Sequence, residues 1–404
     1  MSTSLEAPSQ NARPVSNKDP FDLNTLANPF PLHQHLRETG PVVWLEHYQI
    51  WALARYEQVH AALNDWETFC SSAGVGITDF RKEKPWREPS ILLEKDPPEH
   101  THARSAMTRV LSPAAIRSLR EGFEAYAEQL VDELVERGEF DAATDCAEVF
   151  PLKVFPDALG LAADERHHLL RYGNIAFNAF GPRNSLFEAS MEEAPEVSQW
   201  IIARCARDKL APDGLGARIF SMADEGKITE REAGLLVRSL LTAGVDTTVN
   251  GIGCALRSLA ANPDQWAILR DDPKLARAAF EETLRYDSPV QTFFRTTTRP
   301  VEIEGITLGE GEKLLMFLGA ANRDPRRWDN PDKFDIQRKA TGHVGFGSGI
   351  HGCVGQMIAR LEAEVILNAL TKRVHTLELT AKPEPKLNNT LRGWAHIPVR
   401  VTAK

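Results

Sequence analysis

The spacing of apolar residues along the chain predicts a protein built mostly of amphipathic helices. Apolar residues recur at helical spacing in four long segments, residues 114–138, 229–261, 274–287 and 354–373. The longest of these begins with Thr229 as N-cap and Glu232 three residues later, and it stops at Asn262-Pro263. A further helix is expected to start at Asp96-Pro97-Pro98-Glu99, with Asp96 as its N-cap.

Shorter runs rich in β-branched and aromatic residues predict small β-sheets beside the helices. Residues 42–45 and 49–54 are expected to form a hairpin that turns at Glu46-His47. Further strands are predicted in residues 291–298, 301–318 and 394–402. Residues 325–350, rich in Pro, Gly and charge, predict a long irregular segment. The fold class is therefore mainly α with small β-sheets.

Composition narrows the class of protein. Residues 1–18, rich in Ser, Asn and Pro, are expected to be a disordered tail without a signal peptide, and residues 19–404 a single domain. The formal net charge of −9 argues against nucleic acid as a partner. No apolar run is long enough to span a membrane. The five cysteines are odd in number and widely spaced, which favours a reducing cytoplasm over a disulfide scaffold.

The richest motif is a glycine-rich loop at residues 346–355, FGSGIHGCVG, immediately before the last predicted helix. Glycines let a backbone approach a flat ligand. Cys353 stands near the helix N-terminus, where unpaired N–H groups stabilise a thiolate. A glycine loop with an incidental buried cysteine is one alternative, and a phosphate loop is another, although no Gly-Lys-Ser/Thr follows. The long, fixed spacing favours a thiolate that ligates haem iron.

This loop resembles the haem-binding loop of the cytochrome P-450 superfamily, and the resemblance covers essentially the whole ordered chain. It implies a triangular helical prism that holds haem b between the long oxygen-side helix and the helix after Cys353. Residues 282–285 match the family's E-x-x-R helix, and residues 328–338 match its meander. The resemblance implies a structural network of Glu282, Arg285 and Arg338, although the same residues alone are also typical of a weak surface pair.

The middle of the longest predicted helix, residues 243–253, contains three glycines and two threonines, all poor helix formers. Close helix packing is one explanation, and an opened turn beside a cofactor is the other. The string resembles the acid–alcohol pair of monooxygenases in this family. It implies that Thr247 is the hydroxyl at the oxygen site and Asp246 the proton relay. The facing of Thr248 favours a packing role.

Haem contacts are implied by the same resemblance. Beside Cys353, the residues expected to bind the cofactor are His100, Arg104, Arg295, His351, Phe346, Gly347, Gly355, Ala243 and Gly244. Basic side chains among them are expected to bind the haem propionates. No metal other than the haem iron is predicted, because no histidine pair has convincing zinc spacing.

Several segments resemble bacterial enzymes that O-demethylate or hydroxylate para-substituted benzoates such as 4-methoxybenzoate. The matching carboxylate-binding positions are Arg87, Ser90, Arg238, Ser239 and Thr242, and the matching ring contacts are Phe177, Phe180 and Phe293. Taken singly, each Phe is also typical of ordinary core. Thr242 stands where serine is expected in the group, which puts the ring preference in doubt.

The expected partners are an aromatic carboxylic acid, dioxygen, and a [2Fe–2S] ferredoxin with its NAD(P)H-linked reductase, because the chain has no reductase module of its own. Arg104 and Arg109 are candidates for a docking patch on the thiolate side, and solvated surface is the alternative for Arg109. A monomer is expected. The competing functions are a monooxygenase of another small aromatic or hydrophobic acid, a haem-based sensor or carrier, and a peroxygenase, whereas a zinc hydrolase is remote.

Overall fold

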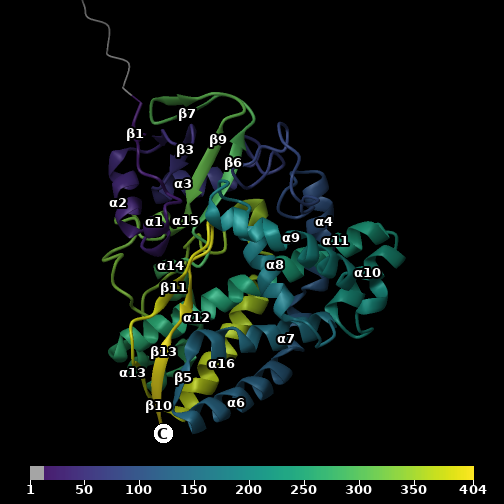
Figure 1. Cartoon of the computed structure of the whole chain (residues 1–404), viewed down its shortest axis with the longest axis vertical. Helices are drawn as coiled ribbons and strands as arrows, with labels where there is room; N and C mark the ends of the chain where they lie inside the picture. The colour runs from purple at the N-terminus through teal and green to yellow at the C-terminus, as the bar shows by residue number, and fades with distance from the viewer. Residues whose placement is uncertain (1–12) are drawn as a thin grey trace, which may run out of the picture.

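The structure is a computed structural model that describes residues 13–404 (Figure 1). Its β-rich part is a six-stranded sheet of β1 (Val15–Ser16), β2 (Val43–Leu45), β3 (Ile50–Leu53), β9 (Lys313–Phe317), β6 (Thr292–Thr297) and β4 (Phe69–Cys70), in that order. The antiparallel β2–β3 hairpin confirms the expected one. The predicted tail boundary at residue 18 is wrong, because Val15 and Ser16 pair in parallel with β2, while residues 1–12 lie outside the described part.

Three smaller sheets complete the β-structure. They consist of β10 (Val374–Leu379), β13 (Pro398–Ala403) and β5 (Glu139–Asp141); of β11 (Glu384–Lys386) and β12 (Gly393–His396); and of β7 (Val301–Ile303) and β8 (Ile306–Leu308). Four short helices accompany the large sheet, α1 (Leu23–Ala27), α2 (Phe30–Thr39), α3 (Tyr56–Asn64) and α15 (Leu318–Ala321). Residues 325–348 contain no helix or strand, as predicted for most of 325–350.

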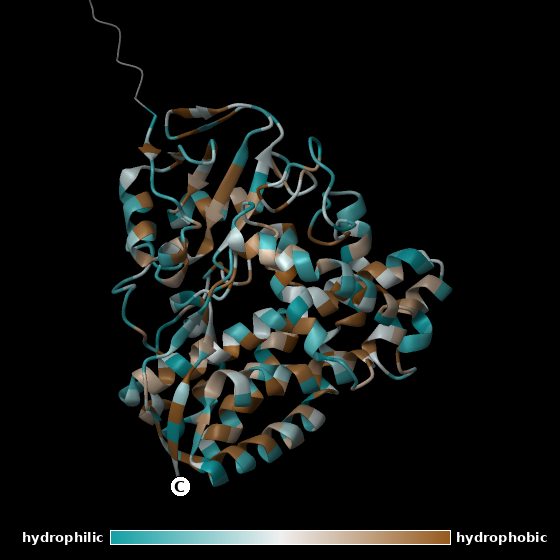
Figure 2. Ribbon diagram, viewed as in Figure 1, coloured by the Kyte–Doolittle hydropathy of each residue, from teal (hydrophilic) through white to brown (hydrophobic). Residues whose placement is uncertain are grey.

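Helices form the rest of the molecule. They are α4 (Glu99–Val110), α5 (Pro113–Arg117), α6 (Arg120–Arg137), α7 (Val149–Leu159), α8 (His167–Asn178), α9 (Ser185–Arg204), α10 (Leu215–Asp224), α11 (Glu230–Gly244), α12 (Asp246–Ala261), α13 (Pro263–Asp271), α14 (Ala276–Tyr286) and α16 (Gln356–Arg373). Helix α16 packs against α6, α14 and α12. The largest apolar core joins these helices, and Figure 2 shows hydrophobic and hydrophilic residues alternating along them, as amphipathic packing requires.

Three expected boundaries are wrong. The predicted helix 229–261 breaks at Val245, so that α11 and α12 are separate helices. Residues 114–138 also form two helices, α5 and α6, with Ser118 and Leu119 between them. Asp96 does not cap α4, whose N-cap is Pro98; the Asp96 carboxylate instead accepts hydrogen bonds from the backbone N–H groups of residues 71 and 72.

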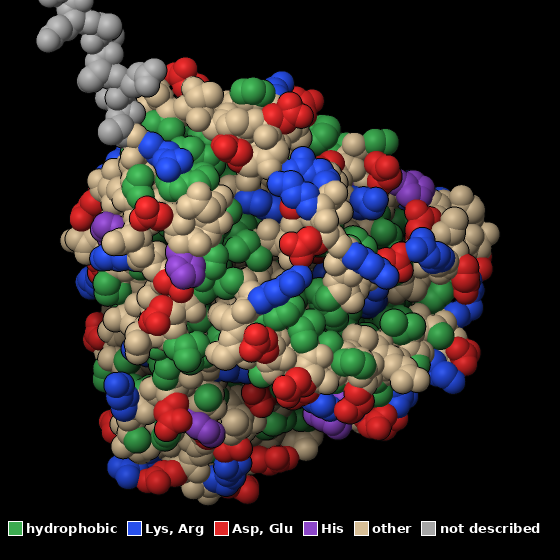
Figure 3. All heavy atoms as spheres, turned by 45° about the horizontal axis from the view of Figure 1, so that its top comes forward, with side chains coloured by type: hydrophobic (Ala, Val, Ile, Leu, Met, Phe, Trp, Pro, Cys, Tyr) green, Lys and Arg blue, Asp and Glu red, His purple; other side chains and the backbone are tan. Residues whose placement is uncertain are grey.

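The surface carries both signs of charge. Figure 3 shows basic and acidic side chains intermingled over one face, with hydrophobic side chains between them in its middle. On that face the net charge of −9 is therefore not gathered into one acidic patch. Among the described helices, none combines the length and the apolar character that crossing a membrane requires.

Candidate active site

One cavity collects most of the residues singled out in the sequence. It lies between α11–α12 and the loop before α16. Its walls include Cys353, Phe346, Gly347, Gly355, His351, Arg104, Arg295, Ala243, Gly244, Thr247, Arg87, Ser90, Arg238, Ser239, Thr242, Phe177, Phe180 and Phe293. His100 and Asp246 are buried outside this lining. Residues more than 250 positions apart in the sequence, such as Arg87 and Cys353, therefore line one cavity.

Cys353 is the only one of the five cysteines that lines the cavity. Its backbone N–H donates to the carbonyl of Phe346 at 2.8 Å, which closes the loop, and Gly347 in that loop has φ of +70°. Burial raises the pKa of the Cys353 thiol, while hydrogen bonding from the Gly355 N–H and the charge of Arg104 lower it. A bound metal ion removes the proton from such a thiol outright. The sulfur is thus placed as a metal ligand rather than as a free thiolate.

Four basic side chains lie near the cysteine loop with unused hydrogen-bonding capacity. Nε2 of His100 and both ring nitrogens of His351 are buried without a hydrogen-bond partner, and the two rings lie 4.4 Å apart. Arg295 is 3% exposed and donates only to the Phe294 carbonyl, and burial lowers its pKa to about 10. Arg104 donates to the carbonyl of Gly352 at 2.6 Å.

Buried polar groups need hydrogen-bond partners and buried charges need counter-ions. The two propionate carboxylates of a haem held by Cys353 would supply both, so the residues present fit this cofactor. Asp96 lies 3.7 Å from Nε2 of His351, too far for a hydrogen bond, and leaves the ring free to turn toward such a ligand.

The break between α11 and α12 lies directly on the cavity wall. Oγ1 of Thr247 donates to the carbonyl of Ala243 at 2.6 Å and faces the cavity. Thr248 is 4% exposed and donates to the carbonyl of Gly244, but it also borders the cavity, so its packing role stays a prediction. A Cβ on Gly244 would stand 2.5 Å from the Phe155 ring, so close packing requires glycine there. Both explanations offered for the glycines, close packing and an opened turn, therefore apply.

Asp246 is a deeply buried acid beside this wall, although it does not line the cavity itself. It is 1% exposed, and burial raises its pKa while Lys386 lowers it. Its Oδ1 accepts no hydrogen bond. A Cβ on Gly173 of α8 would stand 2.8 Å from Cβ of Asp246, so the backbone of α8 packs directly against the Asp246 side chain.

Polar side chains line the part of the cavity formed by α11. Arg87 forms an ion pair with the buried Glu94 at 3.1 Å. Arg238 is 6% exposed, donates to the carbonyl of Glu88 at 2.8 Å, and has no carboxylate partner within the described residues. Oγ of Ser90 and Oγ of Ser239 are 3.1 Å apart. Of the two arginines, Arg238 is the one whose charge is uncompensated.

Three phenylalanines form an apolar wall next to these groups. The rings of Phe177 and Phe180 are 5.7 Å apart in an edge-on arrangement, and the rings of Phe180 and Phe293 are 5.8 Å apart. Val75 and Leu391 complete the cluster. Edge-on and tilted rings at these distances suit contact with another aromatic ring.

Comparison with known proteins agrees with this geometry. The family model described as Cytochrome P450 matches residues 196–398. Cytochrome P450 CYP199A2 from Rhodopseudomonas palustris is 55% identical over 401 residues, which cover 98% of this chain and 97% of that protein. The chain belongs to the cytochrome P450 family.

Two further relatives are more distant than CYP199A2. Cytochrome P450 107B1 from Saccharopolyspora erythraea is 35% identical over 87% of this chain and 89% of its own length. The solved structure of cytochrome P450 CREJ in complex with (4-ethylphenyl) dihydrogen phosphate superposes with a TM-score of 0.84, at 27% identity, over 98% of this chain and all of that one. The P450 fold expected from the sequence is confirmed, as are haem as cofactor and monooxygenase as enzyme class.

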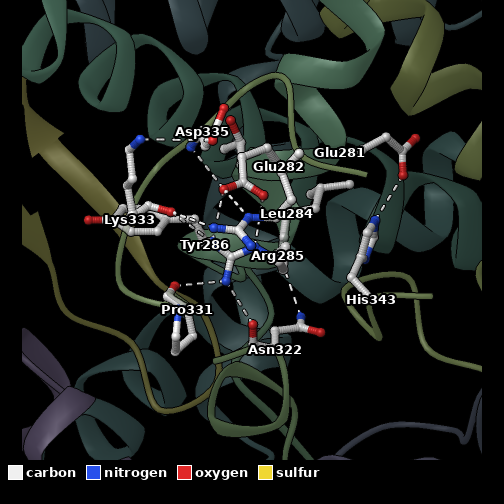
Figure 4. Close-up of polar contacts among 12 residues, drawn as sticks. Glu281, Glu282, Leu284, Arg285, Tyr286, Asn322, Pro331, Lys333, Asp335 and His343 are labelled. Carbon is white, nitrogen blue, oxygen red and sulfur yellow. Dashed lines mark hydrogen bonds and ion pairs between the residues drawn. The ribbon is translucent and has the colours of Figure 1, made fainter. Parts of the chain in front are cut away.

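In this P450 the network of Glu282, Arg285 and Arg338 is present and buried. Nε and Nη2 of Arg285 donate to the two carboxylate oxygens of Glu282 at 2.8 and 2.9 Å, and Nε of Arg338 adds a contact of 3.2 Å. Arg285 also donates to the backbone carbonyls of Asn322, Pro331 and Lys333 (Figure 4). The helix α14 thereby fixes the irregular chain that leads to the cysteine loop.

The structure also reveals four ionisable residues that the sequence analysis missed. Tyr172 lies buried beside Arg87 and Arg238, and burial raises its pKa. Glu94 holds Arg87, and Lys386 holds Asp246. Glu362 lines the cavity from α16 with both oxygens unpartnered, and burial raises its pKa well above the ordinary value. No local motif marks these residues, since their partners are distant in sequence.

Proposed function

We propose that this P450 O-demethylates or hydroxylates small para-substituted aromatic acids such as 4-methoxybenzoate. The observation that carries the proposal is Arg238, a buried guanidinium on the cavity wall without a carboxylate of its own. A buried charge of this kind is stable only with a counter-ion, and the carboxylate of an aromatic acid supplies one.

The neighbouring hydroxyls complete an anion site. Ser239 donates its proton to the carbonyl of Leu235, and Thr242 donates to that of Arg238. The Ser90 hydroxyl, which contacts Ser239, turns to donate to the substrate carboxylate. Ser239 lies about two helical turns before Thr247. A carboxylate held there leaves the para substituent directed toward the oxygen side, with the Phe177, Phe180 and Phe293 wall along the ring.

Two findings from related proteins support this substrate class. The resemblance to benzoate-oxidising enzymes covers the same arginines, hydroxyls and phenylalanines. In addition, CREJ, the structural relative reported above, has been solved with an aryl phosphate, which is also a para-substituted aromatic anion. The extra methyl of Thr242 narrows the site beside the carboxylate without removing its hydroxyl.

An Arg238→Gln variant is expected to bind 4-methoxybenzoate about 30-fold to 1,000-fold more weakly, because a buried charged hydrogen bond is worth roughly 2–4 kcal/mol. The methyl ester, which lacks the charge, should bind both enzymes alike. Titration of the Soret band measures both affinities. Arg231→Gln is the matched control, since Arg231 is an exposed arginine on the same helix. A methyl ester that binds the unmodified enzyme as tightly as the acid would contradict the carboxylate site.

On the oxygen side, haem supplies the redox chemistry that activates dioxygen, and the protein supplies protons and shields the site from water. Thr247 holds a proton at Oγ1 on the cavity wall, and Asp246 behind it accepts and returns protons through its carboxylate. Both residues follow the break at Val245 and stand in the first turn of α12, where the Thr247 hydroxyl donates to the Ala243 carbonyl across the break.

A Thr247→Ala variant should keep substrate affinity but lose coupling, with product formed per NAD(P)H oxidised falling about tenfold or more. The balance of hydrogen peroxide released against product formed measures this loss. Thr248→Val is the control from the adjacent, buried position. If Thr247→Ala stays fully coupled, the proton-delivery role is wrong and a haem-based sensor or carrier becomes the better proposal.

Electrons are proposed to come from NAD(P)H through a [2Fe–2S] ferredoxin and its reductase. Arg109 on α4 is exposed and forms no ion pair within the described residues, so it is available to an acidic partner. Arg104, in contrast, is tied to the cysteine loop through Gly352. Turnover with hydrogen peroxide that equals turnover with the ferredoxin system would favour a peroxygenase instead.

A further inference from the structure

A series of charged side chains leads from Asp246 to the surface. The carboxylate of Asp246, 2% exposed, lies 3.7 Å from Nζ of Lys386, whose side chain is 29% exposed. Lys386 is the only cation within 4 Å of this carboxylate in the described part of the chain. It comes from β11, which is far in sequence from the helices that form the cavity. Lys386 thus joins the acid behind the oxygen site to the outside of the protein.

The backbone fixes Lys386 in this place. In the β11–β12 hairpin, Lys386 pairs with Gly393. The backbone of Gly393 lies so close to α12 that a Cβ there would stand 1.7 Å from Oδ1 of Asn250. Asn250 in turn donates to the carbonyl of Asp246 at 2.8 Å. The hairpin is therefore held against the first turn of α12, and Lys386 is not a freely moving surface side chain.

Further ionisable groups continue the series outward. Glu148 lies between η1 (Ala142–Ala147), which packs against both α12 and β12, and the start of α7, and it is half-buried. Burial raises its pKa, the charge of Lys386 lowers it and that of Asp246 raises it. Asp141, which also acts on Glu148, lies 2.7 Å from Nδ1 of His396, and the His396 side chain is 54% exposed. On the other side of Asp246, the backbone of Gly173 in α8 packs directly against its side chain. Lys386 is the charged group that lowers the pKa of Asp246.

We propose that Lys386 and Glu148 form the route by which protons enter Asp246. Glu148 takes a proton from solvent and passes it inward by way of water, and Asp246 receives one proton for each that it delivers toward Thr247. Lys386 keeps its charge throughout and acts as a positioning residue that holds the Asp246 carboxylate toward the route. This inference rests on the proposed function, which assigns the relay role to Asp246.

Lys386→Met tests the route in the haem-loaded enzyme. Soret titration should give unchanged affinity for 4-methoxybenzoate, while turnover falls about tenfold and the solvent deuterium isotope effect on turnover rises. Infrared pH titration, with the Asp246 band identified by its loss in Asp246→Asn, should show a higher pKa for that carboxyl, because the cation that lowers it is gone. Lys386→Arg should restore both. Glu148→Gln should slow turnover without removing the Asp246 band.

Lys382→Met is the matched control, an exposed lysine just before the same hairpin. The double variant of Lys386→Met and Asp246→Asn should turn over no more slowly than Asp246→Asn alone. Full additivity of the two changes, or an unchanged pKa of Asp246 in Lys386→Met, would overturn the route. If Asp246→Asn itself leaves turnover unchanged, the relay role in the proposed function fails, and the route fails with it.

Discussion

Replacing Glu282 by alanine is expected to lower the free energy of unfolding by about 3–5 kcal/mol, because it leaves two arginines in the interior without their counter-ion. Glu282 and Arg285 are both 0% exposed, and Arg338 is 13% exposed. Glu282 also accepts the backbone N–H of Asp335 at 3.0 Å. A loss of this size removes a large part of the stability of an ordinary protein, which is about 5–15 kcal/mol.

The first consequence should be seen in the cysteine loop. Arg285 holds the backbone carbonyls of three residues in the irregular chain between α15 and Cys353, so loss of Glu282 frees that chain. Chemical denaturation and the haem content of purified protein measure the effect. An Arg285→Lys variant should also be destabilised, because an ammonium group cannot make two parallel bonds to Glu282 and also reach these carbonyls.

Lys333→Ala is the matched control for this prediction. The Lys333 side chain is 65% exposed and lies 4.0 Å from Asp335, whereas its backbone carbonyl is the group that Arg285 uses. An exposed pair of this kind contributes at most about 1 kcal/mol. Equal losses in Lys333→Ala and Glu282→Ala would show that the network does not carry the stability assigned to it.

Cys353→Ala is expected to reduce monooxygenation to background. The family holds its haem by a cysteine thiolate, which supplies the electron density that favours cleavage of the O–O bond. The reduced carbon monoxide complex should then lose the spectrum of a thiolate-ligated haem, whether or not haem stays bound. Cys70→Ala, a buried cysteine of β4 outside the cavity lining, is the control and should keep that spectrum. A thiolate spectrum in the Cys353→Ala protein would assign the ligand to another cysteine.

The sequence allowed the chemistry to be predicted where residues of fixed spacing carry it. The ten residues around Cys353 and the Asp246-Thr247 pair are each continuous in the sequence. Most of these residues line the cavity, and the others lie next to residues that do. The amphipathic helices could be predicted for the same reason, because the spacing of apolar residues is also a local property of the sequence. The residues of the proposed substrate site could be named only through resemblance, because Arg87 and Arg238 are separated by 151 positions in the chain.

Other features could not be predicted because they depend on contacts between distant segments. Asp96 stands where the sequence predicts a helix N-cap, but its carboxylate instead accepts hydrogen bonds from the backbone N–H groups of Ser71 and Ser72. Lys386 looks like an ordinary charged residue of a short strand until the hairpin places it over Asp246. The break at Val245 is similar: glycines and threonines weaken a helix over several residues, and only the structure shows that it breaks directly after Gly244, which packs against Phe155.

The break at Val245 also separates the proposed substrate-binding residues from the proposed proton-delivery residues. Arg238, Ser239 and Thr242 lie on α11, whereas Asp246 and Thr247 begin α12. If the proposed function holds, substitutions in α11 are expected to change which substrate binds while Asp246 and Thr247 in α12 keep their place. Directed evolution confined to residues 235–242 should therefore yield variants that oxidise new substrates, while the product formed per NAD(P)H oxidised stays high. This short segment is the part of the chain to redesign for a new substrate.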